Sequence, residues 1–376
     1  MKDFSLNVVD ATSSKIRKIT DKKKVDTLDL GLGQLPYKAP QALIDAGTQT
    51  FNEGLLQYTE NAGLPELREA IANERNHLFN NSYTKQNVAV TSGAEHSLYT
   101  ALGTLLNPGD EVLVPELSFQ AYTEITKLFG AKVIAYPLND SYKLIPSRFP
   151  DLITQKTKVI IINSPSNPTG SVMSHNELEQ LSTVLKDTDV YIISDEVYSH
   201  LIFNGEQKAP SINSYYPKTI IVDSLSKRSA ATGLRLGWLC GPEDFIQQAI
   251  KLIQYSITCA SLPSQRAALA VVGNMSLLPN PYIQRLQTNK DILYKSLSGT
   301  PLVTYESDGA FYYFANISNF GKSLDISLRL LEKQNVLTIP GISFGIAGDS
   351  CIRISFATET SVLEESLKRI RTELGL

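Results

Sequence analysis

Four short stretches of the sequence combine residue types that could bind an anion beside a reactive amine. Each follows a run of apolar, β-branched residues: Ser92-Gly93-Ala94-Glu95, Ser164-Pro165-Ser166-Asn167, Asp195-Glu196-Val197-Tyr198 and Ser224-Leu225-Ser226-Lys227, with Arg235 a little further on. Hydroxyl groups, an arginine and the first amides of a helix bind phosphate, and a lysine beside other positive groups loses its proton more easily. The pattern predicts a phosphate-bearing ligand next to a nucleophilic lysine.

Each stretch on its own also has a purely structural explanation. The small residues after Thr91 could only cap a helix, and the prolines around Asn167 could only form a rigid turn. Asp195 could belong to a structural salt bridge, because a carboxylate at the end of a buried strand needs a partner. A plain surface role for Lys227 is disfavoured, because small and apolar residues follow it. The four stretches together favour a ligand site.

Seven β-branched runs between about residues 88 and 240 indicate the strands that position these side chains. They are Val88–Thr91, Glu111–Pro115, Lys132–Leu138, Lys158–Asn163, Val190–Ser194, Thr219–Val222 and Leu236–Leu239. Helical patterns separate them, and several are apolar at consecutive positions, as strands covered by helices on both faces must be. We therefore expect an α/β fold with a mostly parallel seven-stranded sheet between helices, whose ligand lies at the carboxyl ends of the strands.

The two chain ends show a different pattern. Beyond about residue 290, Phe311–Ala315 and Cys351–Phe356 are predicted strands, while Asp325–Gln334 and Ser361–Leu374 are predicted amphipathic helices. The N-terminal segment has a predicted helix near Ser14–Thr20 and no sheet of its own. We expect a large domain of residues 46–288 and a smaller α+β domain that combines residues 1–45 with residues 289–376.

Composition excludes several other classes of protein. The 376 residues include 35 Lys and Arg against 38 Asp and Glu, so the net charge of −3 gives no general attraction to nucleic acid or an anionic membrane. No apolar run approaches the length of a membrane span, and the first ten residues do not resemble a signal peptide, so we expect a cytoplasmic protein. Three widely spaced cysteines cannot form a four-thiolate zinc site, and we expect no metal.

The chain resembles the aspartate aminotransferase superfamily, the class I and II aminotransferases of fold type I. Beyond the four stretches, the resemblance rests on Leu30-Gly31-Leu32-Gly33, Tyr58-Thr59, Glu66-Leu67-Arg68, Pro340-Gly341-Ile342-Ser343-Phe344-Gly345 and Arg353-Ile354-Ser355-Phe356-Ala357. It implies pyridoxal 5′-phosphate as cofactor and transfer of an amino group from an L-α-amino acid to a 2-oxo acid by a ping-pong mechanism. It also implies a homodimer with shared active sites.

The resemblance further implies a role for each matching residue. Lys227 is expected to bond covalently to the cofactor and then to move the substrate proton. Asp195 is expected to hold the ring nitrogen protonated, Asn167 and Tyr198 to donate to the phenolic oxygen, and Phe119 to stack on one ring face, with Val197 on the other.

The phosphate and the substrate have their own expected partners. The phosphate is assigned to the backbone amides of Ala94 and Glu95, the side chains of Ser224, Ser226 and Arg235, and Tyr58 from the neighbouring subunit. The substrate carboxylate is assigned to Arg353, with Gly33 and Asn167 beside it.

Three questions stay open from the sequence. A β- or γ-lyase or a synthase on the same fold would share every cofactor contact, and a non-catalytic domain of a transcription regulator is a more remote alternative. The usual Pro after Tyr-Thr is replaced by Glu60 and Asn61, and Gln34-Leu35-Pro36 also departs from the family, both near the substrate mouth. An acidic substrate would need a further cation, with Arg17, Lys127, Arg228 and Arg266 as candidates. Lys227-Arg228-Ser229 is similar to some succinyldiaminopimelate aminotransferases.

Overall fold

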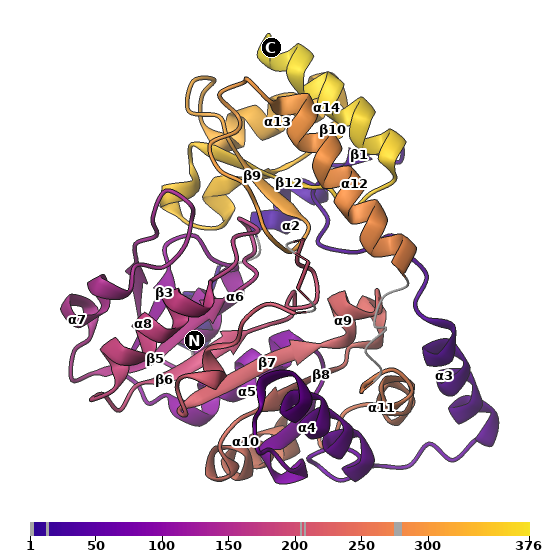
Figure 1. Cartoon of the computed structure of the whole chain (residues 1–376), viewed down its shortest axis with the longest axis vertical. Helices are drawn as coiled ribbons and strands as arrows, with labels where there is room; N and C mark the ends of the chain where they lie inside the picture. Colours follow the sequence, from indigo (N-terminus) through magenta and orange to yellow (C-terminus); the bar gives the residue numbers. More distant parts are fainter. Residues whose placement is uncertain (1–3, 13–14, 204, 207, 274–279) are drawn as a thin grey trace.

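The architecture is known from a computed structural model that describes residues 4–12, 15–203, 205–206, 208–273 and 280–376. Its centre is a seven-stranded sheet in the order β2-β8-β7-β6-β5-β3-β4 (Figure 1). The strands are β2 (Val88–Thr91), β3 (Glu111–Pro115), β4 (Lys132–Tyr136), β5 (Thr157–Asn163), β6 (Tyr191–Asp195), β7 (Thr219–Ser224) and β8 (Gly237–Cys240). Only β8 runs antiparallel to its neighbours β2 and β7, so the expected mostly parallel sheet of seven strands is confirmed.

Helices cover both faces of this sheet, because its strands are apolar on both sides. In β5, Val159 and Ile161 pack into one hydrophobic cluster, while Ile160 and Ile162 pack into another on the opposite face. The first face is covered by α5 (Ala94–Leu105), α6 (Gln120–Leu128) and α10 (Glu243–Ser256). The second is covered by α4 (Pro65–Phe79), α7 (Phe149–Leu152), α8 (His175–Leu185) and α11 (Leu262–Leu269), with α3 (Gln41–Glu53) packed against α11.

A smaller α+β domain lies above the carboxyl ends of the central strands (Figure 1). Its antiparallel sheet has the order β11 (Ile339–Pro340), β12 (Cys351–Ser355) and β9 (Tyr312–Asn316). The helices α12 (Asn280–Leu297), α13 (Ser323–Gln334) and α14 (Thr360–Leu374) belong to the same domain, where α12 and α14 pack against each other. The strands and helices predicted beyond residue 290 are confirmed to within two residues at each end.

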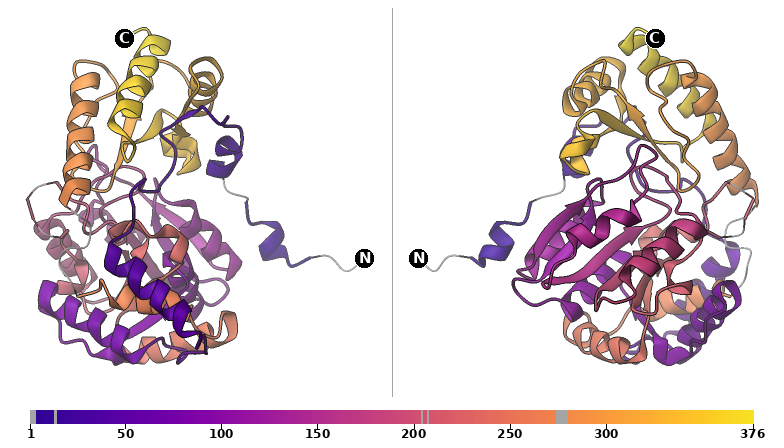
Figure 2. Two further views of the ribbon diagram at one scale, coloured as in Figure 1. Left: turned by 90° about the vertical axis from the view of Figure 1, so that its right-hand side faces the viewer. Right: turned by 60° about the vertical axis from the view of Figure 1, so that its left-hand side comes forward.

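The N-terminal segment joins this small domain. The helix α2 (Lys15–Thr20) packs against β11, and β1 (Leu28–Asp29) pairs in parallel with β10 (Val336–Leu337). The segment therefore has no sheet of its own but supplies one strand to a pair that unites the two chain ends. Ser14, the first residue of the predicted helix, lies outside the described residues. The short helix α1 (Leu6–Val9) lies at the rim of the molecule, where Asn7 Nδ2 donates to the carbonyl oxygen of Leu128 in α6 at 3.1 Å, and the described residues before it project outward (Figure 2).

Across the described ranges, no helix is both long enough and apolar enough to pass through a lipid bilayer.

Candidate active site

A cavity of about 530 Å³ lies between the two domains, at the carboxyl ends of the central strands. The large domain contributes the residues after β5, β6 and β7 together with the first turn of α5. The small domain contributes Tyr312 from β9, Arg353 from β12, the segment around Gly33 and one face of α2. Residues separated by more than 300 positions in the sequence therefore face one space, because the two chain ends form one domain that lies over the carboxyl ends of the parallel strands.

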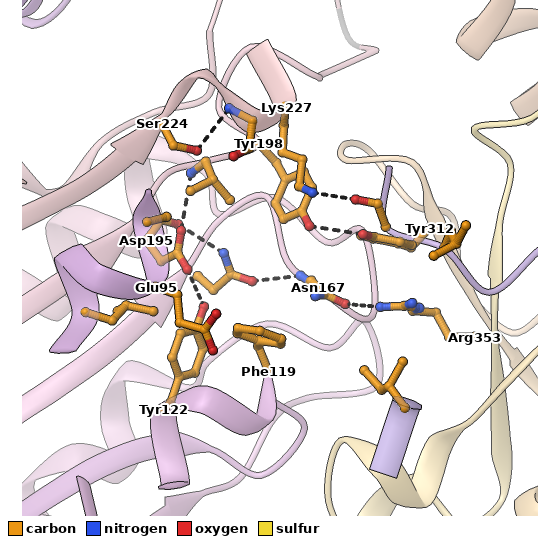
Figure 3. Close-up of a pocket in the computed structure, with 18 of the residues that line it drawn as sticks. Glu95, Phe119, Tyr122, Asn167, Asp195, Tyr198, Ser224, Lys227, Tyr312 and Arg353 are labelled. Atoms are coloured by element: carbon orange, nitrogen blue, oxygen red, sulfur yellow. Dashed lines mark hydrogen bonds between the residues drawn. The ribbon is translucent and has the colours of Figure 1, made fainter. Parts of the chain in front are cut away.

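Lys227 lies on α9 (Leu225–Arg228), the single helical turn that follows β7, and its side chain points into the cavity (Figure 3). Its Nζ donates a hydrogen bond to the carbonyl oxygen of Gly33. Burial, reinforced by the charges of Arg353 and Arg235, lowers the pKa of the Lys227 amine to about 8. A larger share of this amine is therefore uncharged near neutral pH than of an ordinary lysine, as a nucleophile requires.

Asp195 ends β6 and is 5% exposed. Its Oδ2 accepts a hydrogen bond from the Tyr122 hydroxyl at 2.6 Å, and its Oδ1 accepts one from the Val197 amide at 3.3 Å (Figure 3). The Asn163 side chain donates to the Asp195 carbonyl oxygen at 3.0 Å. No lysine or arginine among the described residues forms an ion pair with Asp195, and burial raises the pKa of its carboxyl to about 6. The carboxylate thus lacks the cation that its burial demands.

Arg353 is nearly buried in the opposite wall of the cavity. Its Nη1 donates to Asn167 Oδ1 at 2.7 Å, and its Nη2 donates to the Gly31 carbonyl oxygen at 2.6 Å. The guanidinium lies over the ring of Tyr312 with 4.3 Å to the ring centroid, and its buried Nε has no hydrogen-bond partner in the described structure. A buried arginine without an acidic partner is suited to an anionic ligand such as a carboxylate.

Asn167 and Tyr198 lie between Lys227 and Arg353 (Figure 3). The Asn167 amide accepts the hydrogen bond from Arg353 through its oxygen, so its NH₂ group is the end that remains to donate. The backbone amide of Asn167 donates to Asn163 Oδ1 at 2.7 Å, which fixes the turn after β5. The hydroxyl groups of Tyr198 and Tyr312 lie 3.0 Å apart.

The start of α5 forms one end of the cavity. Gly93 precedes the helix with φ of 87° and offers no side chain to cap it, so the first amides, including those of Ala94 and Glu95, lack partners within the helix. A Cβ at Gly93 would lie 2.8 Å from Arg235 Nη2, so the arginine packs closely over this turn. Helix amides and a guanidinium at one point form a site for an anion such as phosphate.

The remaining predicted residues lie in two different places. Ser224, Ser226 and Phe119 line the same cavity, and Ser224 Oγ accepts a hydrogen bond from the Ser226 amide at 3.3 Å. Tyr58 does not line it: this residue is 85% exposed and borders a separate hollow with Cys259 and Leu262. In one chain, therefore, the structure brings together all the predicted site residues except Tyr58.

Sequence reasoning missed three polar neighbours of the site: Tyr122, Asn163 and Tyr312. Tyr122 belongs to the Phe119 to Tyr122 stretch, and a tyrosine one helical turn after Phe119 was the available signal. Asn163 is the last residue of a predicted strand, where a side chain can reach the neighbouring strand end. Nothing in the sequence pairs Tyr312 with Tyr198, because the contact joins two domains.

Comparisons with known proteins agree with this geometry. The family model for class I and II aminotransferases matches residues 25–370. A probable aspartate aminotransferase of Methanocaldococcus jannaschii is 34% identical over 95% of this chain and 96% of its own length. A probable N-acetyl-LL-diaminopimelate aminotransferase of Bacillus subtilis is 36% identical over 92% of this chain and 88% of its own length. A solved Thermus thermophilus aspartate aminotransferase with maleate has a TM-score of 0.93 at 29% identity, with full coverage of both chains.

The chain belongs to the class I and II aminotransferases, which use pyridoxal phosphate. It is an enzyme of the transaminating type: all three of these relatives are named aminotransferases, which supports transfer over the lyase alternative.

The described residues fit the cofactor that this family uses. Pyridoxal phosphate carries a phosphate, an aldehyde and a ring nitrogen that can hold a proton. The turn of Gly93 beneath Arg235 suits the phosphate, the Lys227 amine suits the aldehyde, and Asp195 lacks the cation that a protonated ring nitrogen would supply. For each group of the cofactor, the cavity thus offers a side chain or turn of matching chemistry.

Proposed function

We propose that this aminotransferase converts L-α-amino acids and 2-oxo acids by a ping-pong mechanism, with Lys227 as its catalytic residue. The observation that supports this most strongly is the pair formed by Lys227 and Arg353, a weakly basic amine and a buried guanidinium that face one cavity. An amino acid whose carboxylate pairs with Arg353 would place its α-carbon toward Lys227. Such fixed placement is a large part of what an enzyme contributes to a reaction.

The cofactor, when bound, supplies an electron sink for the α-carbon of the substrate. In our proposal Lys227 Nζ removes the proton from the substrate α-carbon and returns it on the cofactor side. Asp195 holds a proton at the ring nitrogen, while the Asn167 amide and the Tyr198 hydroxyl donate to the phenolic oxygen. Phe119 would lie against one face of the ring and Val197 against the other. Arg353, with Asn167 and Gly33 beside it, orients the substrate carboxylate.

We propose that the phosphate binds where the first turn of α5 meets α9. Its partners would be the amides of Ala94 and Glu95 together with Ser224, Ser226 and Arg235. The helix dipole of α5 and the positive charge of Arg235 both favour an anion at this point. Ser224 and Ser226 lie on the same turn as Lys227, so this binding would also fix the distance between the phosphate and the amine.

We propose that the enzyme is a homodimer in which Tyr58 reaches the phosphate of the partner subunit. Supporting this, Tyr58 lies outside the cavity of its own chain, next to the exposed apolar residues Phe51, Leu55 and Leu56. The helix α1 lies at the rim of the molecule (Figure 2), and the exposed apolar residues in it and just before it are Phe4, Leu6, Val8 and Val9. Two groups of large exposed apolar side chains, each gathered within a few residues of sequence, favour burial in an assembly.

We also propose two domains close to the expected ranges of 46–288 for the large domain and 1–45 with 289–376 for the small one, with each boundary moved to the start of a helix. The packing of α3 on α11 assigns the whole of α3 to the large domain, and the packing of α12 on α14 assigns the whole of α12 to the small one. The cavity would then lie at the junction of two bodies, where closure could exclude water from the substrate.

For the substrate side chain, we propose an acidic group bound by Arg17. Of the four candidate cations, Arg17 is the one that lines the cavity, from α2. The other three, Lys127, Arg228 and Arg266, do not line this cavity. The similar Thermus thermophilus enzyme was solved with maleate, a dicarboxylate, and relatives named for aspartate point the same way.

Replacing Arg17 by Gln tests this proposal. We expect kcat/KM for aspartate and glutamate to fall by about tenfold to a hundredfold, and kcat/KM for leucine and phenylalanine to change little, because only the first pair presents a second carboxylate. Lys18→Gln on the same helix is the matched control, because Lys18 does not line the cavity. An equal loss for all four amino acids, or a wild-type preference for the neutral ones, would reject Arg17 as the specificity residue.

A further inference from the structure

Two successive buried charges on α4 contact the residues that immediately follow Lys227 and Asp195 in the sequence. Glu74 Oε2 accepts a hydrogen bond from Arg228 Nη2 at 2.7 Å, and Arg75 Nη1 donates to Glu196 Oε2 at 2.7 Å. All four side chains are at least nine-tenths buried. One helix on the second face of the sheet thus anchors both chain segments that carry the reactive groups.

The first contact stabilises a very short element. The helix α9 is a single turn, which has little stability of its own, and Lys227 lies in it next to Arg228. Arg228 is completely buried, and besides Glu74 it pairs with Asp223 at 3.5 Å. Asp223 in turn accepts a hydrogen bond from the Ser224 amide at 2.7 Å. Both ends of the turn are therefore tied to the same ionic cluster.

The second contact fixes the chain directly after β6. Glu196 Oε2 accepts a hydrogen bond from Arg75 Nη1. Glu196 Oε1 accepts hydrogen bonds from the hydroxyl groups of Ser211 at 2.5 Å and of Ser194 at 3.1 Å. Arg75 also donates to Ser211 Oγ at 3.0 Å. The carboxylate of Asp195 itself has only two hydrogen bonds within the described structure, from Tyr122 and the Val197 amide. Its position therefore depends on how firmly the backbone beside it is held.

The cluster is balanced in charge and separate from the cavity. Its three acids are Glu74, Glu196 and Asp223, and its three bases are Arg75, Arg228 and Lys208, whose buried Nζ has no hydrogen-bond partner in the described structure. None of these six side chains lines the cavity. A substitution among them can therefore change the reaction only by moving the segments that do.

We propose that Glu74 and Arg75 are positioning residues for the reaction, Glu74 acting on Lys227 through Arg228 and Arg75 acting on Asp195 through Glu196. This inference rests on the roles proposed above for Lys227 and Asp195. The competing explanation is that the cluster only stabilises the fold. Buried ion pairs are weak evidence for stability in themselves, because desolvation offsets much of their attraction.

The test compares holoenzymes that carry Glu74→Gln, Glu74→Asp or Glu69→Gln. Glu69→Gln is the matched control, because Glu69 is an exposed carboxylate on the same helix. For Glu74→Gln we expect kcat per cofactor-loaded site to fall by about tenfold to a hundredfold while KM changes by less than about threefold, because Lys227 moves and the carboxylate site of the substrate does not. Glu74→Asp keeps the charge and should recover part of the loss.

A spectroscopic readout separates positioning from stability. We expect the pH midpoint of the cofactor absorbance in the Glu74→Gln holoenzyme to move by about half a unit or more, because the surroundings of the Lys227 nitrogen change. Leu181→Ala, a core substitution in α8 on another part of the sheet, lowers the melting temperature without touching the cluster and should leave this midpoint unchanged.

Arg75→Lys tests the second half of the proposal. Lysine keeps the positive charge but lacks the planar fork whose two nitrogens bond Glu196 and Ser211, so Asp195 should be held less firmly. We expect a shifted cofactor absorbance and a cofactor dissociation constant raised by about tenfold.

The proposal is overturned if Glu74→Gln and Arg75→Lys lower the melting temperature as Leu181→Ala does, yet keep wild-type kcat, KM and absorbance midpoint. If Glu74→Gln does not fold, Glu74→Asp and Arg75→Lys decide the question by the same criteria. Wild-type holoenzyme is run alongside. If its cofactor is converted by no amino acid, the proposed function has failed; if it is converted normally and the variants match it, only the positioning roles have failed.

Discussion

At the scale of single residues, burial shifts the proton affinities of two groups in opposite directions. The same cavity lowers the pKa of the Lys227 amine to about 8 and raises the pKa of the Asp195 carboxyl to about 6, because burial penalises the charged form of each. The uncharged amine of Lys227 can therefore attack a carbonyl carbon, and the buried carboxylate of Asp195 is stabilised by pairing with a protonated nitrogen.

The depressed pKa of Lys227 predicts the pH dependence of cofactor attachment. The amine reacts only when uncharged, and at pH 7 a pKa of about 8 leaves about a tenth of it uncharged, far more than an ordinary lysine offers. With cofactor-free enzyme, we expect the rate of covalent attachment of pyridoxal phosphate to rise with pH and to level off above about pH 8. With Nα-acetyl-lysine, the matched reference compound, the same rise in attachment rate should occur about two pH units higher. A midpoint near 10 for the enzyme would contradict the account.

Most of the site residues could be predicted because their types and their place after strands carry the signal. Asp195 is expected to need a partner simply because a buried strand ends there. Tyr122 and Tyr312 were not predicted, since their roles depend on contacts with Asp195 and Tyr198 that only the folded chain creates. The buried positions of Glu74 and Arg75 were not predicted for the same reason, because in the sequence these residues resemble the exposed charges of an ordinary helix.

At the scale of elements, the ends of the strands were predicted to within about two residues. A strand that is buried on both faces has apolar residues at consecutive positions, which stand out in the sequence. The antiparallel direction of β8 could not be predicted from that signal, since apolar runs carry no direction. The decisive turns are those between strand and helix. At Gly93 the chain adopts a φ of 87°, which places the first amides of α5 toward the cavity.

Gly93→Ala tests the importance of that turn for cofactor binding. A side chain at this φ and ψ would cost about 1–3 kcal/mol in backbone strain and would crowd Arg235, so we expect the dissociation constant of pyridoxal phosphate to rise by about tenfold or more. Gly109→Ala is the control: its φ of 93° is also positive, but nothing in the described structure lies within 4 Å of the added carbon. Calorimetric titration with the cofactor measures the dissociation constant of each variant. Equal dissociation constants in the two variants would show that the turn does not shape the site.

At the scale of the whole molecule, the two chain ends meet in one small domain that closes over the large one. The pairing of β1 with β10 joins residues about 300 positions apart, so sequence patterns could suggest the union of the ends but not its register. The exposed apolar residues around Tyr58 and on α1 have no cover within the described part of one chain. The proposed second subunit would cover them and complete the phosphate site.

Replacing Leu55 and Leu56 by Asp tests this assembly. Both side chains are exposed in the single chain, so the fold should survive while two charges prevent the apolar surfaces from associating. We expect light scattering to give the mass of one 41.4 kDa chain and turnover to fall sharply, because Tyr58 no longer reaches a partner. Leu324→Asp, an exposed apolar position on α13, should remain dimeric and active. A wild-type enzyme that is monomeric and fully active would contradict the shared site.

The central claim, that Lys227 carries out amino-group transfer in this cavity, is tested most directly by the half-reaction. Wild-type holoenzyme mixed with an amino acid alone, without a 2-oxo acid, should convert its cofactor from the pyridoxal to the pyridoxamine form, with release of one equivalent of 2-oxo acid. Lys227→Ala should slow this conversion by on the order of 10⁴-fold, because Lys227 is the one lysine among the described residues that line the cavity. Near-normal conversion by that variant, or release of ammonia in place of pyridoxamine formation by the wild type, would contradict the account.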